Sequence, residues 1–238
     1  SAKAIEAPRG YVQVVSTKCD WREATDELGK RFEISFNTYK PFACGIVIHP
    51  AIDAAVQLRA RGVRAEDVER IELKVHSLVL ELTGKKEPQD GLQGKFSVYH
   101  GFAAGLIFGQ AGEGEYDDAV VTRADVVALR GKVVATVDDS IDEAAADVTA
   151  VMKDGRRERV FVEHAIGSLE RPMTDANLEA KLRSLAEPVI EKLRELDISR
   201  TSPLEALNLL NRLQEMARME GGSGVLPEKN SADSYGKL

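Results

Sequence analysis

Apolar and polar residues alternate along several stretches of the chain, and this period of two predicts half-buried β-strands. One strand is expected in RFEISF at residues 31–36, and a second in ERIELKV at 69–75 with an uneven continuation to Leu82. A further strand is expected at 132–138. Residues 146–164 predict a hairpin, because an Asp-Gly pair separates two apolar runs. The middle of the chain therefore contains the predicted β-structure.

Helices are expected between these strands. The first begins at Pro50, since proline suits the first turn of a helix, and ends near Gly62. The second covers residues 95–109, where glycine and alanine are frequent enough for close backbone approach, so we expect this helix to be buried. A polar segment at 21–30 predicts one further short helix, and turn formers predict a loop at 86–94.

The C-terminal part of the chain has a helical pattern only. Leucine, valine and isoleucine recur at steps of three and four from 178 to 193, which predicts an amphipathic helix. The Ser-Pro-Leu-Glu sequence starting at Ser202 is a capping box with proline at the first helical position, so a second helix is expected over 204–217. Residues 221–238 are polar and glycine-bearing, which predicts a flexible tail.

The irregular order of strands and helices favours an α+β fold over a doubly wound sheet. We expect residues 31–170 to form a compact mixed α/β domain. Residues 1–30 and 171–220 are expected to belong to a separate helical body, because the pattern changes near Met173. Both C-terminal apolar stripes together would exceed the apolar patch that a soluble monomer tolerates. A second polypeptide, either a different chain or another copy of this one, is therefore expected to cover them.

Composition narrows the classes of function. The formal net charge of −7 argues against a nucleic-acid surface, which would need clustered Lys and Arg. The two cysteines, Cys19 and Cys44, form neither a disulfide framework nor a metal-binding spacing. The chain shows no apolar run of membrane length and no signal-peptide pattern, so we expect a soluble, cytoplasmic protein.

The most distinctive stretch for chemistry is residues 36–59, which place Lys40, Cys44 and His49 ahead of a helix. Each has an ordinary structural interpretation: a solvated lysine, a small buried thiol and a hydrogen-bonded structural histidine. In the functional interpretation, the Lys40 ammonium binds a carboxylate and stabilises an enolate-like charge. His49 then donates to a carboxylate or moves a proton near neutral pH.

The order of motifs resembles a known family. Lys-Pro-aromatic-x-Cys is followed by a histidine nine residues after the lysine and then by Pro-Ala-Ile-Asp-Ala. The other three motifs are EAPRGYVQVVS at 6–16, KFSVYHGFAAGLIFG at 95–109 and DGRRERVFVEHAIGSLERPMTDANLEAKLRSLA at 154–186. Together they resemble the MmgE/PrpD family, whose members dehydrate, decarboxylate or epimerise small carboxylates.

The resemblance implies that this chain is the second half of such an enzyme. It implies a lid-like α+β domain whose flanking helices belong to a larger all-helical domain. The other half, with an aspartate and a histidine facing the site, would then come from a partner chain. The implied substrate is a small di- or tricarboxylate, and the implied chemistry is proton abstraction alpha to a carboxylate without a cofactor or metal. A dehydratase-type lyase is favoured, with an epimerase, a decarboxylase or a non-catalytic binding or assembly module as alternatives.

The resemblance also implies which residues form the site. The predicted catalytic residues are Lys40, His49 and His100, and the predicted substrate-binding residues are Lys40, Cys44, Ser97 and Tyr99. For His100 two orientations are open, into the cleft or into the core. Ser97 either contacts substrate or only serves the start of its helix. Many family members carry arginine where this chain has Ile46, and this difference removes one carboxylate clamp.

Overall fold

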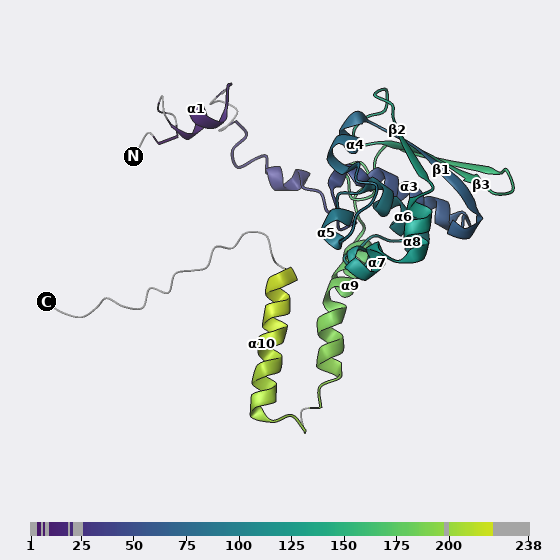
Figure 1. Cartoon of the computed structure of the whole chain (residues 1–238). Helices are drawn as coiled ribbons and strands as arrows, with labels where there is room; N and C mark the ends of the chain where they lie inside the picture. Colours follow the sequence, from purple (N-terminus) through teal and green to yellow (C-terminus); the bar gives the residue numbers. More distant parts are fainter. Residues whose placement is uncertain are drawn as a thin grey trace. The chain divides into compact units, whose positions relative to one another are not determined.

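The computed structural model describes residues 4–5, 7, 10–18, 20, 26–197 and 200–220, with side chains as far as Gln214. The chain divides into two compact units, residues 1–177 and 178–238. The elements are shown in Figure 1. They are α1 (Tyr11–Val15), η1 (Glu33–Phe36), η2 (Ile46–Ile48), α3 (His49–Ala60), η3 (Ala65–Asp67), β1 (Val68–Val75), α4 (Ser77–Thr83), α5 (Gly91–Gly94), α6 (Val98–Phe108), η4 (Gly114–Tyr116), α7 (Asp118–Val121), α8 (Ala124–Arg130), β2 (Val133–Val137), β3 (Ala146–Met152), β4 (Arg157–Val162), α9 (Asp175–Arg194) and α10 (Pro203–Glu220).

A four-stranded mixed sheet lies in the first unit, with the strand order β2-β1-β3-β4 (Figure 1). β1 runs parallel to β2, with Ile71 opposite Val133. It runs antiparallel to β3, which continues into β4 as the predicted hairpin. The hairpin turn contains Gly155 at a φ of 85°, a conformation that glycine adopts without steric cost. Because helices and mixed strands alternate irregularly along the chain, the α+β prediction is confirmed.

The helix α3 is buried because it packs against the sheet and against another helix. It contacts β3 and β4 as well as α6, and eight of its residues are buried. The α6 backbone comes close to α3, since a Cβ at Gly105 would stand 3.0 Å from both the Ile52 carbonyl oxygen and the Ala55 Cβ. Nine residues of α6 are buried, as the small residues of 95–109 predict. The helices predicted from Pro50 and over 95–109 are therefore confirmed.

The predicted strand at 31–36 is wrong. Residues Glu33–Phe36 form a 3₁₀ turn, closed by hydrogen bonds from the Ser35 N–H to the Phe32 carbonyl and from the Asn37 N–H to the Ile34 carbonyl. The large apolar side chains of this segment are exposed. No strand of the described part of the chain pairs with the segment. Alternation supplies two faces, but a strand also needs a neighbour for its backbone hydrogen bonds.

The predicted continuation of the second strand to Leu82 is also wrong. β1 ends at Val75, which lies opposite Val137, the last residue of β2. His76 then caps α4, and its Nδ1 accepts a hydrogen bond from the Leu78 N–H at 3.2 Å. The apolar residues that follow Val75 therefore lie on a helix, because the pairing partner ends and a cap begins.

The second unit contains α10 and most of α9, and both predicted helices are confirmed. The predicted capping box is present at the start of α10. The Ser202 N–H donates to a Glu205 carboxylate oxygen at 2.8 Å, and the Glu205 N–H donates to the Ser202 hydroxyl at 3.3 Å. α9 contains no buried residue over its whole length. It also spans Pro188, which lacks the N–H donor that an interior helical position normally supplies.

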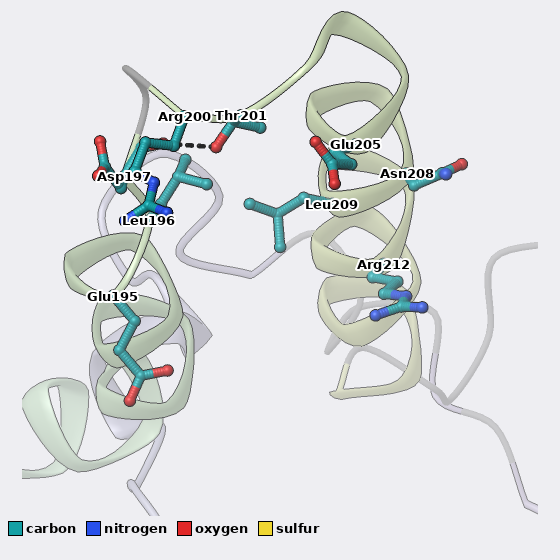
Figure 2. Close-up of a pocket in the computed structure, with 9 residues that line it drawn as sticks. All are labelled: Glu195, Leu196, Asp197, Arg200, Thr201, Glu205, Asn208, Leu209 and Arg212. Carbon is teal, nitrogen blue, oxygen red and sulfur yellow. Dashed lines mark hydrogen bonds between the residues drawn. The ribbon is translucent and has the colours of Figure 1, made fainter.

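A shallow hollow of about 590 Å³ lies between the end of α9 and the start of α10 (Figure 2). The loop between the helices is tied by a hydrogen bond from the Thr201 hydroxyl to the Asp197 carbonyl at 2.6 Å. The hollow is lined by Glu195, Leu196, Asp197, Arg200, Thr201, Glu205, Asn208, Leu209 and Arg212. None of the predicted site residues lines it, so it does not coincide with the predicted chemistry.

Parts of the remaining predictions lie outside the described residues. The tail predicted at 221–238 is one of them, and so are residues 21–25 of the helix predicted at 21–30. The domain boundaries near residues 30 and 170 stay predictions. Within the described ranges, no helix is long and apolar enough to cross a bilayer.

Candidate functional site

Residues 40–45 form a loop that we call the Lys40–Cys44 loop, after two of the predicted site residues that it contains. Segments far away in the sequence hold this loop in place. The Ala43 N–H donates to the carbonyl of Ala111 at 2.9 Å. The Gly45 N–H donates to the carbonyl of Lys95 at 3.1 Å. These two backbone bonds fix the loop against the residues that precede α6 and against those that follow it.

Lys40 and Cys44 lie together within this loop. The Lys40 Nζ donates to the Cys44 carbonyl at 3.4 Å, while its side chain remains exposed. The Cys44 thiol is buried, and burial raises its pKa from 9.0 to about 11, although the Tyr116 hydroxyl, Lys40 and Lys95 lower this pKa by smaller amounts. The thiol therefore stays neutral near pH 7, which does not suit a nucleophile. This placement agrees with the structural interpretation of Cys44 as a small buried thiol.

Tyr116 is a site residue that the sequence did not predict. Its ring is buried, and its hydroxyl meets no nitrogen or oxygen partner among the described residues. The polar group that it faces is the Cys44 thiol. Burial, followed by the neighbouring Cys44, raises the pKa of Tyr116 well above its ordinary value. Its signal in the sequence is weak, a single tyrosine in the glycine-bearing loop at 112–118.

His100 lies beneath Tyr116, in the core. The two rings meet edge to face with centroids 5.2 Å apart, and His100 is fully buried. Its Nε2 lies 2.9 Å from the Glu115 carbonyl, and because a carbonyl only accepts, Nε2 carries the proton. Burial is the main cause that lowers the pKa of His100, and Arg130 lowers it further. His100 is therefore a neutral core imidazole, and its Nδ1 has no partner in the described part of the chain.

Ser97 and Tyr99 belong to the start of α6. The Ser97 hydroxyl accepts from the His100 N–H at 3.1 Å and donates to the Lys85 carbonyl at 2.5 Å. Ser97 is therefore an N-cap, as one of its two predicted roles required. Tyr99 is buried except for a small part, and the Lys86 ammonium lies 5.9 Å from its ring centroid. Burial raises the pKa of Tyr99 above its ordinary value.

His49 is the first residue of α3 and is buried. Its ring meets the edge of Phe42 at a centroid distance of 5.3 Å, and Phe42 belongs to the Lys40–Cys44 loop. His49 is therefore linked to Lys40 through the packing of this loop. Ile46, where the family often has arginine, forms part of the 3₁₀ turn η2 and is exposed.

Three charged residues near the loop or the buried His100 were not predicted as site residues. The Lys95 Nζ lies 2.6 Å from a carboxylate oxygen of Glu113. Arg130, at the end of α8, is buried and donates from Nη1 to the Val121 carbonyl at 3.0 Å. Burial lowers the pKa of Arg130, and Glu87 opposes this shift. A charged residue at a loop or helix end has no sequence signature that separates it from a solvated one.

The arrangement thus has a cationic surface above a neutral buried layer. Lys40 and Lys95 lie on the exposed side, while the thiol, phenol and imidazole of Cys44, Tyr116 and His100 lie beneath. Cations at this position suit the binding of carboxylates. No group of metal-ligating side chains occurs in the described ranges. The structure brings Lys40, Cys44 and His100 into one cluster through Tyr116, and the roles predicted for all six site residues remain predictions.

Comparison with known proteins gives a match over most of the chain. Residues 42–202 match the family model of the MmgE/PrpD C-terminal domain. The chain is 27% identical over 151 residues to 2-methylcitrate dehydratase of Salmonella typhimurium, which covers 59% of this chain and 31% of the relative. The enzyme of the same name from Escherichia coli strain K12 is 28% identical over the same coverage. The chain therefore spans about a third of the length of these relatives, 31%.

A second, shorter match is to a DNA mismatch repair protein. The chain is 49% identical over 59 residues to the DNA mismatch repair protein MutS of Roseiflexus sp. strain RS-1. This match covers 24% of this chain and 5% of the MutS protein. Such a small fraction of a large protein carries no argument about the activity of this chain.

Proposed function

This chain belongs to the MmgE/PrpD family through its C-terminal domain, and on that premise we propose that it forms the second half of an enzyme acting on a small di- or tricarboxylate. The proposed chemistry is abstraction of a proton alpha to a carboxylate, most directly in a dehydratase-type lyase. Relatives named 2-methylcitrate dehydratase support the general dehydratase type. The substrate class and the type of reaction are both part of the proposal.

The observation that carries the proposal is the position of Lys40. Its ammonium is exposed, yet the Cys44 carbonyl and the backbone bonds of the Lys40–Cys44 loop hold it in one region. A held ammonium lowers the energy of a carboxylate and of the enediolate that forms when the neighbouring carbon loses its proton. Such stabilisation grows as negative charge develops, so it accelerates the reaction as well as binding the substrate.

The proposed dehydration removes a proton and a hydroxyl group from neighbouring carbons. A base takes the proton on the carbon alpha to the carboxylate, and the bonding electron pair spreads onto that carboxylate as an enediolate. The electron pair then forms the carbon–carbon double bond as the carbon–oxygen bond on the next carbon breaks. The hydroxide leaves as water after an acid supplies one proton. In this scheme Lys40 stabilises the enediolate, and the catalytic roles of His49 and His100 remain predictions.

The second half alone does not complete the proposed site. We propose that the acid and base on the opposite side come from a partner chain with the helical half, and that the exposed faces of α9 and α10 contact this chain or another copy. An epimerase returns the proton to the other face, and a decarboxylase loses carbon dioxide instead of water. The alternative without enzymatic activity is a non-catalytic binding or assembly module. The mass of the natively purified complex and its turnover of di- and tricarboxylates separate these possibilities.

The test of the proposed function is Lys40→Ala in the complete assembly. Losing one preorganised donor typically costs about 10²–10³ in rate. We expect this loss in kcat with unchanged thermal stability, because the Lys40 side chain is exposed. Lys40→Arg should recover little, since a planar guanidinium does not reproduce a compact charge.

The matched control is Lys153→Ala, another exposed lysine, which lies in the turn between β3 and β4. This control should leave turnover unchanged. Near wild-type turnover of Lys40→Ala would return Lys40 to a solvated lysine beside a proline and remove the main support for the proposed function.

A further inference from the structure

A second lysine lies against the Lys40–Cys44 loop. The carbonyl of Lys95 accepts the Gly45 N–H at 3.1 Å, so the two segments are in direct contact. Lys40 donates to the carbonyl of Cys44, the residue before Gly45. Both ammonium groups also act on the Cys44 thiol, where each favours the charged form. Two cations from different parts of the sequence therefore act on the same thiol.

The Lys95 ammonium is already occupied by a carboxylate of the protein itself. A carboxylate oxygen of Glu113 lies 2.6 Å from the Lys95 Nζ, and the two side chains are 58% and 33% exposed, respectively. An ion pair that is this accessible to water contributes only about 0–1 kcal/mol. Another carboxylate can therefore replace Glu113 at low cost.

The exchange needs only a rotation of the Glu113 side chain, which is 58% exposed. The backbone of the loop is held, because the Tyr116 N–H donates to the Glu113 carbonyl at 2.9 Å. Glu115, two residues later, also fixes the loop, because its carboxylate accepts hydrogen bonds from the Gln110 side chain and the Gly112 N–H at 2.8 Å each. The Glu113 side chain can thus leave Lys95 while the backbone of the loop keeps its place.

We propose that Lys95 binds a second carboxylate of the substrate and that Glu113 occupies this position in the free protein until the substrate displaces it. The inference rests on the proposed function, in which Lys40 takes the first carboxylate. With Glu113 paired, Lys40 and Lys95 together present a net charge of +1, and with Glu113 displaced they present +2, which matches a dicarboxylate. A monocarboxylate gains from Lys40 alone, whereas a dicarboxylate also gains from Lys95 once Glu113 is displaced, so the pair favours two carboxylates.

The test is a titration of the full chain with propane-1,2,3-tricarboxylate, observed by NMR at the Cε carbons of isotope-labelled lysines. In the wild type we expect saturable shifts at Lys40 and Lys95. Glu113→Gln removes the competing carboxylate and should tighten binding by about two- to fivefold, as expected for an exposed ion pair. Lys95→Gln should weaken binding by a similar factor. In the Lys95→Gln background, Glu113→Gln should have no further effect.

The matched control is Glu66→Gln, which also removes one exposed carboxylate. Glu66 follows the C-terminal end of α3, whereas the Lys40–Cys44 loop precedes its N-terminal end. A helix of 12 residues separates these ends by about 18 Å. Glu66→Gln should therefore leave the affinity unchanged, and equal tightening by both variants would mean a net-charge effect and overturn the inference.

The remaining outcomes separate the two proposals. Binding that depends on Lys40 but is unchanged by the Lys95 and Glu113 variants overturns this inference and leaves the proposed function standing. Binding that depends on Lys95 but is unchanged by Lys40→Ala contradicts the proposed role of Lys40. Shifts at neither lysine, with and without the partner half, overturn both.

Discussion

The helix pair α3–α6 and the helix pair α9–α10 both carry large apolar side chains but differ in burial. Eight residues of α3 and nine of α6 are buried, whereas α9 has none. Leu106 in α6 is fully buried, while Leu207 in α10 is 64% exposed. Part of the difference is composition, because α9 and α10 carry many more charged residues, and part is partners, because α3 packs against β3, β4 and α6. Apolar spacing gives a helix a face for burial, and only another element can cover that face.

The exposed face of α10 is therefore the feature that most requires an explanation. Leu204, Leu207 and Leu210 are each more than 60% exposed and recur at steps of three. A repeated row of large apolar side chains marks an interaction surface more often than an isolated exposed leucine does. The family match ends at Ser202, the residue that caps α10. This helix accordingly lies outside the matched domain, and its surface supports the proposed contact with a second polypeptide.

The largest expected effect comes from the same truncation made in both pairs. Leu106→Ala should lower the free energy of unfolding by about 2–5 kcal/mol, because it leaves a cavity in a closed core. Leu207→Ala should change it by less than about 0.5 kcal/mol in the isolated chain. Urea unfolding followed by circular dichroism measures both. A large loss for Leu207→Ala in the isolated chain would show that α10 is covered there and would break the comparison.

The next effect concerns the buried thiol. Burial raises the pKa of Cys44 from 9.0 to about 11, so the protonated thiol stabilises the fold fully below pH 9. As the pH rises from 9.0 to about 11, this stabilisation is lost, by about 2–3 kcal/mol at most. Cys44→Ala should be less stable at neutral pH through lost packing, yet its stability should fall less steeply over this interval.

The effect is measured as the free energy of unfolding in urea, for the wild type and for Cys44→Ala, at several pH values from 8 to 11. Tyr99 is present in both proteins, whereas the raised pKa of Tyr116 depends in part on Cys44, so the difference in slope reports the Cys44–Tyr116 pair. Parallel curves would mean that Cys44 is as accessible as the thiols of exposed loops. The buried layer below Lys40 would then not be closed.

The smallest expected effect is the loss of stability when a helix cap is removed, and it is compared between α6 and α10. Ser97→Ala should cost about 1–2 kcal/mol, because it leaves the buried His100 N–H without its cap and frees the Lys85 carbonyl. Ser202→Ala should cost about 0.5 kcal/mol, since water can replace the exposed Ser202 hydroxyl. Thermal unfolding of the two variants gives the ratio of the two losses of stability. Equal losses would show that burial does not strengthen the cap of α6.

The sequence was sufficient wherever neighbouring residues decide the conformation. The hairpin follows from an Asp-Gly turn between alternating runs, and the start of α10 follows from four consecutive residues at Ser202. The burial of α6 followed from its small residues, since Gly105 allows a close approach to α3. The same reasoning failed at 31–36, where the alternation is present but no strand among the described residues pairs with the segment.

Within the candidate site, the sequence identified the Lys40–Cys44 loop but not the residues that surround it. Tyr116, Lys95 and Glu113 reach this loop through contacts across tens of residues, and no local pattern announces such contacts. The Asp53 carboxylate accepts a hydrogen bond from Gln57 of its own helix at 2.9 Å. The same carboxylate, however, also accepts from Arg171 at 2.9 Å.

What the sequence determined by itself is most of the long helices, the hairpin, the α+β class and the family, since turns, caps and ordered motifs depend on short-range chemistry. What only the tertiary structure decided is which polar groups share an environment. It placed His100 in the core as a neutral imidazole and kept the Lys40 ammonium at the surface. The physical reason is that burial and charge pairing depend on neighbours in space. These neighbours come from distant parts of the chain, which only folding brings together.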